Sequence, residues 1–198
     1  MDHRFDGFVR EEVAKTAALL DALLADPGTL AAVGQIAELC VTALRAGRKI
    51  LFAGNGGSAA DAQHLAAELV GKLAYDRPGL AAMSLTTDTS ILTAVANDYG
   101  YEDTFARQVD AVGATGDVLV GISTSGRSRN VLKAFAAARA KGIATIGMTG
   151  RGGGDFPPLC DLCLCVPSAE TQKIQEAHIV LGHIFCAIVE RQMFPRVP

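Results

Sequence analysis

The chain has 198 residues, and its 18 basic and 21 acidic side chains give a formal net charge of −3. Hydrophobic residues make up 49% and charged residues 20% of the chain, which excludes intrinsic disorder, and the small negative charge excludes a basic nucleic-acid clamp as the default. A chain of this length is expected to form one domain and to bury enough surface to need no disulfide.

The first 47 residues are predicted to be helical. Apolar residues recur near helical spacing at Phe8, Val13, Ala17 and Leu20. A Pro-Gly pair then separates this segment from a second apolar helix over about residues 29–46. The first residues are acidic and contain no early apolar core, so we expect no signal peptide.

After residue 47, short apolar strands alternate with helices. The predicted strands are Lys49–Ala53, Leu80–Leu85, Asp117–Ser123, Ile143–Met148 and Asp161–Val166. The predicted helices are Ala59–Leu73, Thr89–Ala96, Arg129–Lys141 and Glu170–Met193, with an irregular loop at Arg151–Pro158. This alternation is typical of βαβ units and a parallel sheet covered on both faces. We therefore expect one α/β domain over residues 1–198. Its core over residues 48–198 is a three-layer α/β/α sandwich with a five-stranded parallel sheet, and residues 1–47 form a helical N-terminal extension.

The apolar content indicates neither a membrane span nor a disulfide scaffold. No segment reaches the roughly 18 continuous apolar residues that cross a bilayer, and the longest candidate, Ile179–Val189, is interrupted by Gly182 and His183. An odd number of cysteines, five, without a secretory signal favours reduced thiols and a cytoplasmic location.

Three of the cysteines lie close together, at Cys160, Cys163 and Cys165. Thiolate coordination of a metal is one interpretation, but a second cysteine pair is missing from the sequence, which favours buried, unreactive thiols. On an unbulged strand, Cys163 and Cys165 would lie on the face opposite Cys160.

Two loops follow strands and precede helices, where parallel sheets bind ligands. Residues 54–58 read Gly-Asn-Gly-Gly-Ser, and residues 123–128 read Ser-Thr-Ser-Gly-Arg-Ser. Glycines allow close backbone approach, and hydroxyls with backbone N–H groups at a helix start favour an anion. The alternative is that both are ordinary turns and helix caps. Neither matches a dinucleotide or Walker A pattern, so we expect a small phosphorylated molecule.

Four residues could form a metal and acid–base cluster. His64 and Glu68 are four apart on one predicted helix, and Gln175 and His183 are eight apart on the last helix, so each pair shares a helical face. Two imidazoles, a carboxylate and an amide oxygen suit zinc or a similar ion, and a Glu with a His can shuttle protons. The alternative is that such histidines are hydrogen-bonded core residues, which is the role expected of His178.

The motifs together resemble the phosphoheptose isomerase family of the sugar isomerase (SIS) fold. The resemblance rests on residues 51–68 (LFAGNGGSAADAQHLAAE), 85–98 (LTTDTSILTAVAND), 116–130 (GDVLVGISTSGRSRN) and 171–183 (TQKIQEAHIVLGH), and it covers essentially the whole chain. It implies conversion of sedoheptulose 7-phosphate, a ketose, to D-glycero-D-manno-heptose 7-phosphate, an aldose, as a step toward nucleotide-activated heptose for lipopolysaccharide core or capsule.

The same resemblance implies residue roles. It assigns the phosphate to Ser123, Thr124, Ser125 and Ser128. It assigns sugar contacts to Asn55, Gly56, Gly57, Ser58, Asn97 and Asp98, together with Glu68 and Gln175. It makes Glu68 and His183 the acid–base pair, and His64, Glu68, Gln175 and His183 the ligands of one zinc ion per subunit. A homotetramer, with active sites near subunit interfaces, is also implied; no nucleic acid or membrane partner is expected.

Three other interpretations remain open at this stage. Some SIS relatives act as protein-binding modules, but the presence of both Glu68 and His183 favours an enzyme. A sugar-phosphate-sensing regulator would need a DNA-binding domain, for which the chain has no room. An isomerase of another sugar phosphate is the nearest enzymatic alternative, because phosphate loops do not specify sugar length.

Overall fold

The computed structural model describes residues 4–196. The helices are α1 (Asp6–Leu24), α2 (Pro27–Arg45), α3 (Gly57–Val70), α4 (Thr89–Tyr99), α5 (Ala106–Val112), α6 (Arg129–Ala140) and α7 (Thr171–Met193), with short 3₁₀ turns η1 (Tyr101–Asp103) and η2 (Pro157–Leu159). The strands are β1 (Ile50–Gly54), β2 (Ala82–Ser84), β3 (Val118–Ile122), β4 (Ala144–Thr149) and β5 (Leu162–Cys165).

The five strands form one parallel sheet in the order β2-β1-β3-β4-β5. The chain therefore reverses its direction of strand addition between β1 and β3. These two central strands are in register from Ile50↔Val118 to Gly54↔Ile122. Loops that leave such neighbouring strands toward opposite faces open a crevice at the carboxyl edge of the sheet.

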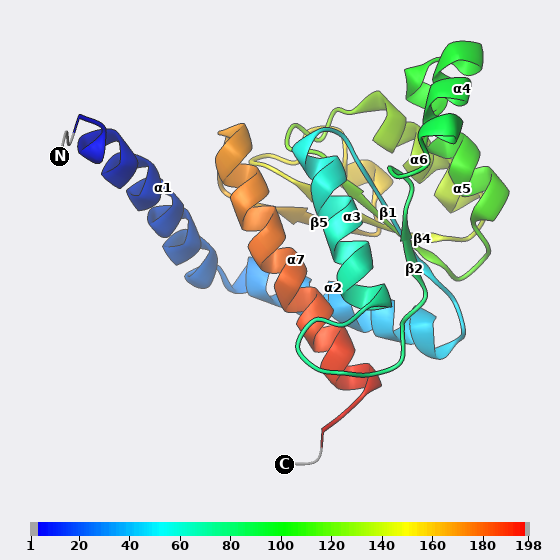
Figure 1. Cartoon of the computed structure of the whole chain (residues 1–198), viewed down its shortest axis with the longest axis horizontal. Helices are drawn as coiled ribbons and strands as arrows, with labels where there is room; N and C mark the ends of the chain where they lie inside the picture. Colours follow the sequence, from blue (N-terminus) through cyan, green and yellow to red (C-terminus); the bar gives the residue numbers. More distant parts are fainter. Residues whose placement is uncertain (1–3, 197–198) are drawn as a thin grey trace.

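Alternating strand residues divide the core between two helical layers. Phe52 and Val120 belong to the larger core, which α2, α3 and α7 complete. Leu51 and Leu119 point the other way, into a smaller core closed by α5 and α6. Figure 1 shows α2, α3 and α7 on one side of the sheet and α5 and α6 on the other. The predicted three-layer α/β/α sandwich with a five-stranded parallel sheet is confirmed.

Each predicted strand is present, with ends that differ by one or two residues. α3 begins two residues before its predicted start, because the helix forms directly from the glycines of the loop. α5 was not predicted at all. It has only seven residues, and too few positions repeat in it for a helical period to be visible.

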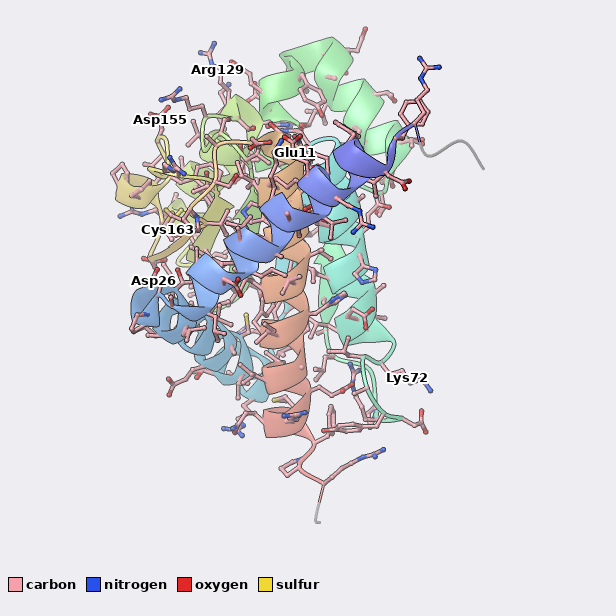
Figure 2. All side chains as sticks on the ribbon, turned by 90° about the vertical axis from the view of Figure 1, so that its left-hand side faces the viewer. Glu11, Asp26, Lys72, Arg129, Asp155 and Cys163 are labelled. Atoms are coloured by element: carbon pink, nitrogen blue, oxygen red, sulfur yellow. The ribbon has the colours of Figure 1, made fainter. Side chains whose placement is uncertain are left out.

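The predicted first helix is present, but the residues whose spacing indicated it do not form its buried face. The buried residues of α1 are Leu19 and Leu23, whereas Phe8 and Val13 are 65% and 64% exposed. Figure 1 shows α1 reaching away from the rest of the chain, and Figure 2 shows it crossing outside α7. Most of the apolar surface of α1 is therefore uncovered in a single chain.

α2 has the length and mean hydropathy, 1.3 over its best window, of a membrane-crossing helix. This helix, rather than Ile179–Val189, is thus the most apolar long segment among residues 4–196. In the structure, α2 packs against α7 and the sheet, and buries residues that include Ile36, Ala37 and Cys40. Its apolar character is accounted for by this packing.

Candidate active site

The two predicted loops lie side by side because they leave neighbouring strands. Gly54 ends β1 opposite Ile122 of β3, so the loops at residues 54–58 and 123–128 begin next to each other. One continues into α3 on the first face of the sheet, and the other into α6 on the second face. The site thus occupies the point where the strand order reverses.

The first loop holds Asn55 in a fixed orientation. Its side-chain Nδ2 donates to Asn130 Oδ1, and Asn130 Nδ2 donates back to Asn55 Oδ1, both at 2.9 Å. The Tyr101 hydroxyl also donates to Asn55 Oδ1 at 2.9 Å. Asn130 and Tyr101 were missed in the sequence analysis. Asn130 falls inside a quoted motif, but the signal for pairing, two amides 75 positions apart, appears only in the fold.

Gln175 of α7 lies against the start of α3. A Cβ added to Gly57 would come within 2.5 Å of Gln175 Nε2 and 2.7 Å of Oε1. A larger residue at the first position of α3 would therefore displace this amide. Ser58 follows, buried at 3% exposure, while Gly56 and Gly57 are exposed.

The second loop gathers hydroxyls in front of α6. Ser123 Oγ lies 2.8 Å from Ser128 Oγ and 3.4 Å from Ser125 Oγ, and Arg127 N donates to Ser125 Oγ at 3.2 Å. Ser128 stands at the N-cap of α6 without capping it through its side chain. Its hydroxyl therefore lies next to the α6 N-terminus, and the two together favour an anion.

A pocket of about 320 Å³ adjoins this loop. Thr124 and Ser125 line it together with the exposed Arg127 and Arg151. Arg151 Nη2 donates to Pro167 O at 3.0 Å, which fixes the direction of its side chain. The loop itself carries no lysine, so these two guanidinium groups supply the nearby positive charge among the lining residues.

His64, Glu68 and His183 converge between α3 and α7. His64 Nε2 lies 2.7 Å from His183 Nε2 and 3.2 Å from Glu68 Oε1. One ligand atom from each residue falls within 4.8 Å of the other two. Two imidazole nitrogens and a carboxylate oxygen are the donor types that zinc selects, so the cluster fits such an ion. Of the four predicted ligands, these three are brought together, while the Gln175 amide lies at Gly57.

Asp61, one turn before His64 on α3, was not among the predicted site residues. Its Oδ2 is buried and has no hydrogen-bond partner among residues 4–196. Burial raises the pKa of Asp61 to about 6, and a charge on His64 would act in the opposite direction. The three-residue spacing to His64 was the available signal, but an Asp in an Ala-rich helix reads equally well as a surface residue.

Asn97 and Asp98 lie exposed at the end of α4. Asn97 Nδ2 donates to Asp98 Oδ1 at 2.7 Å. Within the described chain, no hydrogen bond joins them to another predicted site residue. Their predicted contact with a sugar stays a prediction.

The core role expected of His178 is confirmed. It is fully buried, with Nε2 3.2 Å from Thr149 O and Nδ1 without a partner among the described residues. Burial lowers the pKa of His178 to about 4, against the weaker effect of the Thr149 carbonyl. A neutral ring therefore donates from Nε2 at ordinary pH.

The five cysteines are free thiols. Cys160 and Cys163 both place Sγ close to where a Cβ on Gly147 would lie, so they are on the same side of the sheet rather than on opposite faces. Cys160 precedes β5 and does not follow its alternation. Cys163, Cys165 and Cys160 are half-buried, less than expected. Burial raises the pKa of Cys165 to about 11, consistent with an unreactive thiol.

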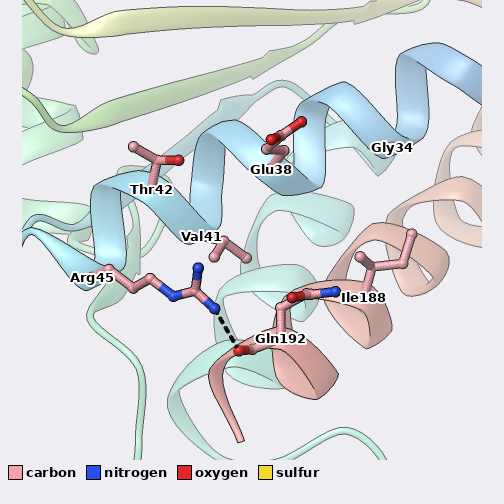
Figure 3. A pocket seen from close by; sticks show the side chains of 7 residues that line it. All are labelled: Gly34, Glu38, Val41, Thr42, Arg45, Ile188 and Gln192. Atoms are coloured by element: carbon pink, nitrogen blue, oxygen red, sulfur yellow. Dashed lines mark hydrogen bonds between the residues drawn. The ribbon is translucent and has the colours of Figure 1, made fainter. Parts of the chain in front are cut away.

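A separate pocket of about 310 Å³ lies between α2 and α7, away from the loops (Figure 3). Arg45 Nη2 donates to Gln192 O across it at 2.9 Å. None of its lining residues belongs to the predicted site, so we assign it no part in the chemistry.

Comparisons with known proteins agree with this arrangement. A family model described as SIS domain matches residues 13–150. A phosphoheptose isomerase of Burkholderia pseudomallei (strain 1710b) is 55% identical over 194 residues, covering 98% of each chain, and one of Aneurinibacillus thermoaerophilus is 51% identical over 187 residues, covering 94% of each. The solved structure of a phosphoheptose isomerase from Neisseria gonorrhoeae has a TM-score of 0.88 and 43% identity, covering 94% of this chain and 98% of the other.

Proposed function

The chain belongs to the phosphoheptose isomerase family of SIS-domain proteins, and from that membership we propose how its own residues carry the reaction. The reaction is the aldose–ketose isomerisation of sedoheptulose 7-phosphate to D-glycero-D-manno-heptose 7-phosphate. The observation that supports the assignment of residues best is the pairing of a hydroxyl-rich loop with the His64–Glu68–His183 cluster on one chain.

The phosphate is assigned to the second loop. Ser123, Thr124, Ser125 and Ser128 offer hydroxyl donors, and the α6 N-terminus adds backbone N–H groups. The sugar is assigned to Asn55, Gly56, Gly57, Ser58, Asn97, Asp98 and Gln175, with Glu68 at the reacting end. The amide pair with Asn130 supports this role for Asn55, because a side chain held in one orientation loses little entropy on binding.

Glu68 and His183 are proposed as the acid–base pair. Glu68 takes a proton from C1 of the open-chain ketose and returns it to C2, which converts the C2 carbonyl to a hydroxyl-bearing carbon through an enediol. His183 moves the second proton, from the oxygen on C1 to the oxygen on C2. Both groups lie within reach of one small molecule, since each approaches His64 Nε2 within 3.2 Å.

Zinc, one ion per subunit, is the proposed cofactor. His64, Glu68 and His183 supply three donors, and Gln175 is the proposed fourth ligand. When bound, the ion would polarise the reacting oxygens and stabilise negative charge on them. A carboxylate that also binds a metal is a weaker base, so we expect Glu68 to change its coordination during turnover.

We further propose a homotetramer that works in the cytoplasm, for lipopolysaccharide core or capsule synthesis. The occupant of the uncovered α1 face is a second copy of this chain, since Phe5, Phe8, Val9 and Val13 are each at least half exposed there. Ile184, beside His183, is 44% exposed. A neighbouring copy that covered it would also shield the cluster from water.

The test is turnover of sedoheptulose 7-phosphate followed by NMR. The expected result is appearance of the aldose heptose phosphate, its loss on chelation and its return with zinc. If conversion continues after verified removal of the metal, the isomerase activity stands and zinc is not its cofactor. No conversion by folded, zinc-loaded protein would move the assignment to another sugar phosphate or to a protein-binding module.

A further inference from the structure

Arg77 and Glu190 form an ion pair that is almost completely buried. Arg77 Nε lies 3.1 Å from Glu190 Oε1, and the two side chains are 2% and 1% exposed. Glu190 also accepts from Leu73 N and Ala74 N, each at 2.9 Å. Burial alone would raise the pKa of Glu190, but these N–H groups and Arg77 hold it below its ordinary value. The carboxylate is therefore ionised and fully bonded, which is the condition for a buried pair to persist.

The Arg77 guanidinium also caps the C-terminal end of α3. Its Nη2 donates to Glu68 O at 2.7 Å, and its Nη1 donates to Leu69 O at 2.6 Å and Gly71 O at 2.9 Å. These carbonyls belong to the last turn of a helix, where no further N–H of that helix reaches them and where a positive charge is favoured. One of them belongs to Glu68 itself.

The pair connects the two helices that carry the cluster. Arg77 fixes the last turn of α3, and Glu190 lies on α7, two turns after His183. Beside the cluster the helices are already in close contact, because a Cβ on Gly182 would come within 2.7 Å of Cδ2 of the fully buried Leu65. His64, Glu68 and His183 thus lie at the level where α3 and α7 are close-packed, and the polar clamp, the Arg77–Glu190 pair, lies further along both helices.

We propose that Arg77 and Glu190 are positioning residues, which hold α3 against α7 so that the donors of His64, Glu68 and His183 stay within one coordination sphere. The inference rests on the proposed metal site. His64 and Glu68 come from one helix and His183 from the other, so the set is preorganised only while the two helices keep their relative position. Changing partners outside the coordination sphere typically lowers metal affinity about 10–100-fold.

A matched control exists elsewhere in the chain. Asp117 is also 1% exposed, and it also accepts two backbone N–H groups, from Lys49 at 3.0 Å and Ala114 at 2.8 Å, and one cationic side chain, Lys49 Nζ, at 2.6 Å. It lies just before β3, at the amino edge of the sheet, opposite the site. Glu190→Gln and Asp117→Asn therefore make the same chemical change in comparable surroundings, but only the first touches the clamp.

The experiment measures zinc affinity by competition with a fluorescent chelator, at a temperature where circular dichroism shows each variant folded. Glu190→Gln and Arg77→Lys are expected to bind zinc about 10–100-fold more weakly than the unaltered chain, and Asp117→Asn to stay within about twofold of it. Gly182→Ala introduces no charge and changes the spacing between α3 and α7 directly, at Leu65. It is also expected to weaken zinc binding.

The outcomes separate this inference from the proposed function. The positioning role is overturned if the Arg77 and Glu190 variants bind zinc as tightly as the unaltered chain. It is also overturned if Asp117→Asn loses as much zinc affinity as they do. Sedoheptulose 7-phosphate turnover by the unaltered chain is measured in parallel. Turnover without any zinc binding would overturn both the metal assignment and the clamp while leaving the isomerase intact.

Discussion

His64 Nε2 and His183 Nε2 lie 2.7 Å apart, although 119 positions separate the two residues in the chain. At this distance one of the two nitrogens donates a hydrogen bond to the other, because two facing lone pairs would repel. Glu68 Oε1, 3.2 Å from the same His64 nitrogen, adds negative charge to the spot. The three side chains therefore place two imidazole nitrogens and one carboxylate oxygen around a single point, which is the basis of the proposed metal site.

The two histidines have separable roles in the proposed mechanism. His64→Gln removes a ligand only, so zinc affinity should fall at least ~100-fold, and excess zinc should restore part of the turnover. His183→Gln removes a ligand and a proton carrier, so saturating zinc should leave turnover at least ~100-fold below normal. Chelator competition and NMR turnover give both values. Equal rescue of the two variants by zinc would contradict the acid–base role of His183.

Glu68→Gln should leave folding unchanged, since the amide keeps the volume of the side chain and can still accept a hydrogen bond from His64. Turnover should fall by ~10²–10⁴-fold, the usual contribution of a positioned base. In deuterium oxide the unaltered enzyme should place deuterium on C2 of the product, and the variant should stop doing so. A near-normal rate, or unchanged labelling, would remove Glu68 from the proton transfer.

Gly57→Ala should impair activity without lowering the stability of the fold. Alanine favours a helix by up to ~1 kcal/mol over glycine, but here the new Cβ would come within 2.5 Å of Gln175 Nε2. We expect a thermal midpoint close to that of the unaltered chain and a raised KM, because Gln175 has to move. The control is Gly34→Ala in α2, where a Cβ meets nothing within 4 Å. Equal kinetics for both variants would remove Gln175 from the site.

Ser128→Ala tests the phosphate loop. A hydrogen bond to a charged group contributes about 1.5–3 kcal/mol, so KM should rise roughly 10–150-fold with a smaller change in kcat. Ser90→Ala, on the exposed side of α4, is the control and should leave KM unchanged. A Ser128→Ala variant limited only in kcat would mean that the hydroxyl acts on the reaction rather than on the phosphate.

His178 should make the fold sensitive to acid. Its folded pKa is about 4 against 6.5 when unfolded, so the unfolded chain binds the proton more readily. The stabilisation is complete above about pH 6.5 and is lost as the pH falls toward 4, by roughly 2–3 kcal/mol between about pH 7.5 and pH 4.5.

Asp61, whose pKa is raised to about 6, acts in the opposite direction over much of the same range. The measurement is therefore the difference in urea-unfolding free energy between the unaltered chain and His178→Gln at each pH. That difference should shrink on acidification. A constant difference would mean that His178 titrates normally.

The layer architecture was predictable because each strand of the core is a short apolar run followed by a turn and a helix. Lys49–Ala53 and Asp117–Ser123, for example, each precede a loop of small polar residues. The strand order was not predictable. β1 and β3 are similar in composition, and no local sequence pattern indicates that they are neighbours in the sheet. The spacing of apolar residues could not show which face of α1 is buried, since the exposed Phe8 and Val13 fit a helical period as well as the buried Leu19 and Leu23 do.

The candidate site, too, was predictable only in part. Residues on one helix, such as His64 and Glu68, could be paired from their spacing alone. Contacts across the fold could not: the approach of Gln175 to Gly57, and the bond between Arg77 and Glu190, join segments more than a hundred residues apart. No periodicity links such residues, and each alone reads as an ordinary surface or helix residue.

The length of α3 between Gly57 and His64 fixes the distance along the helix axis between these two residues. At 1.5 Å per residue, seven residues place the histidine about 10 Å along the helix from the level of the loops. Under the proposed function, a substrate that contacts both the glycine loop at residues 54–58 and the cluster would lie along this offset. The offset between the glycine loop and the cluster thus follows from the rise of a helix, a quantity that side-chain substitutions leave unchanged.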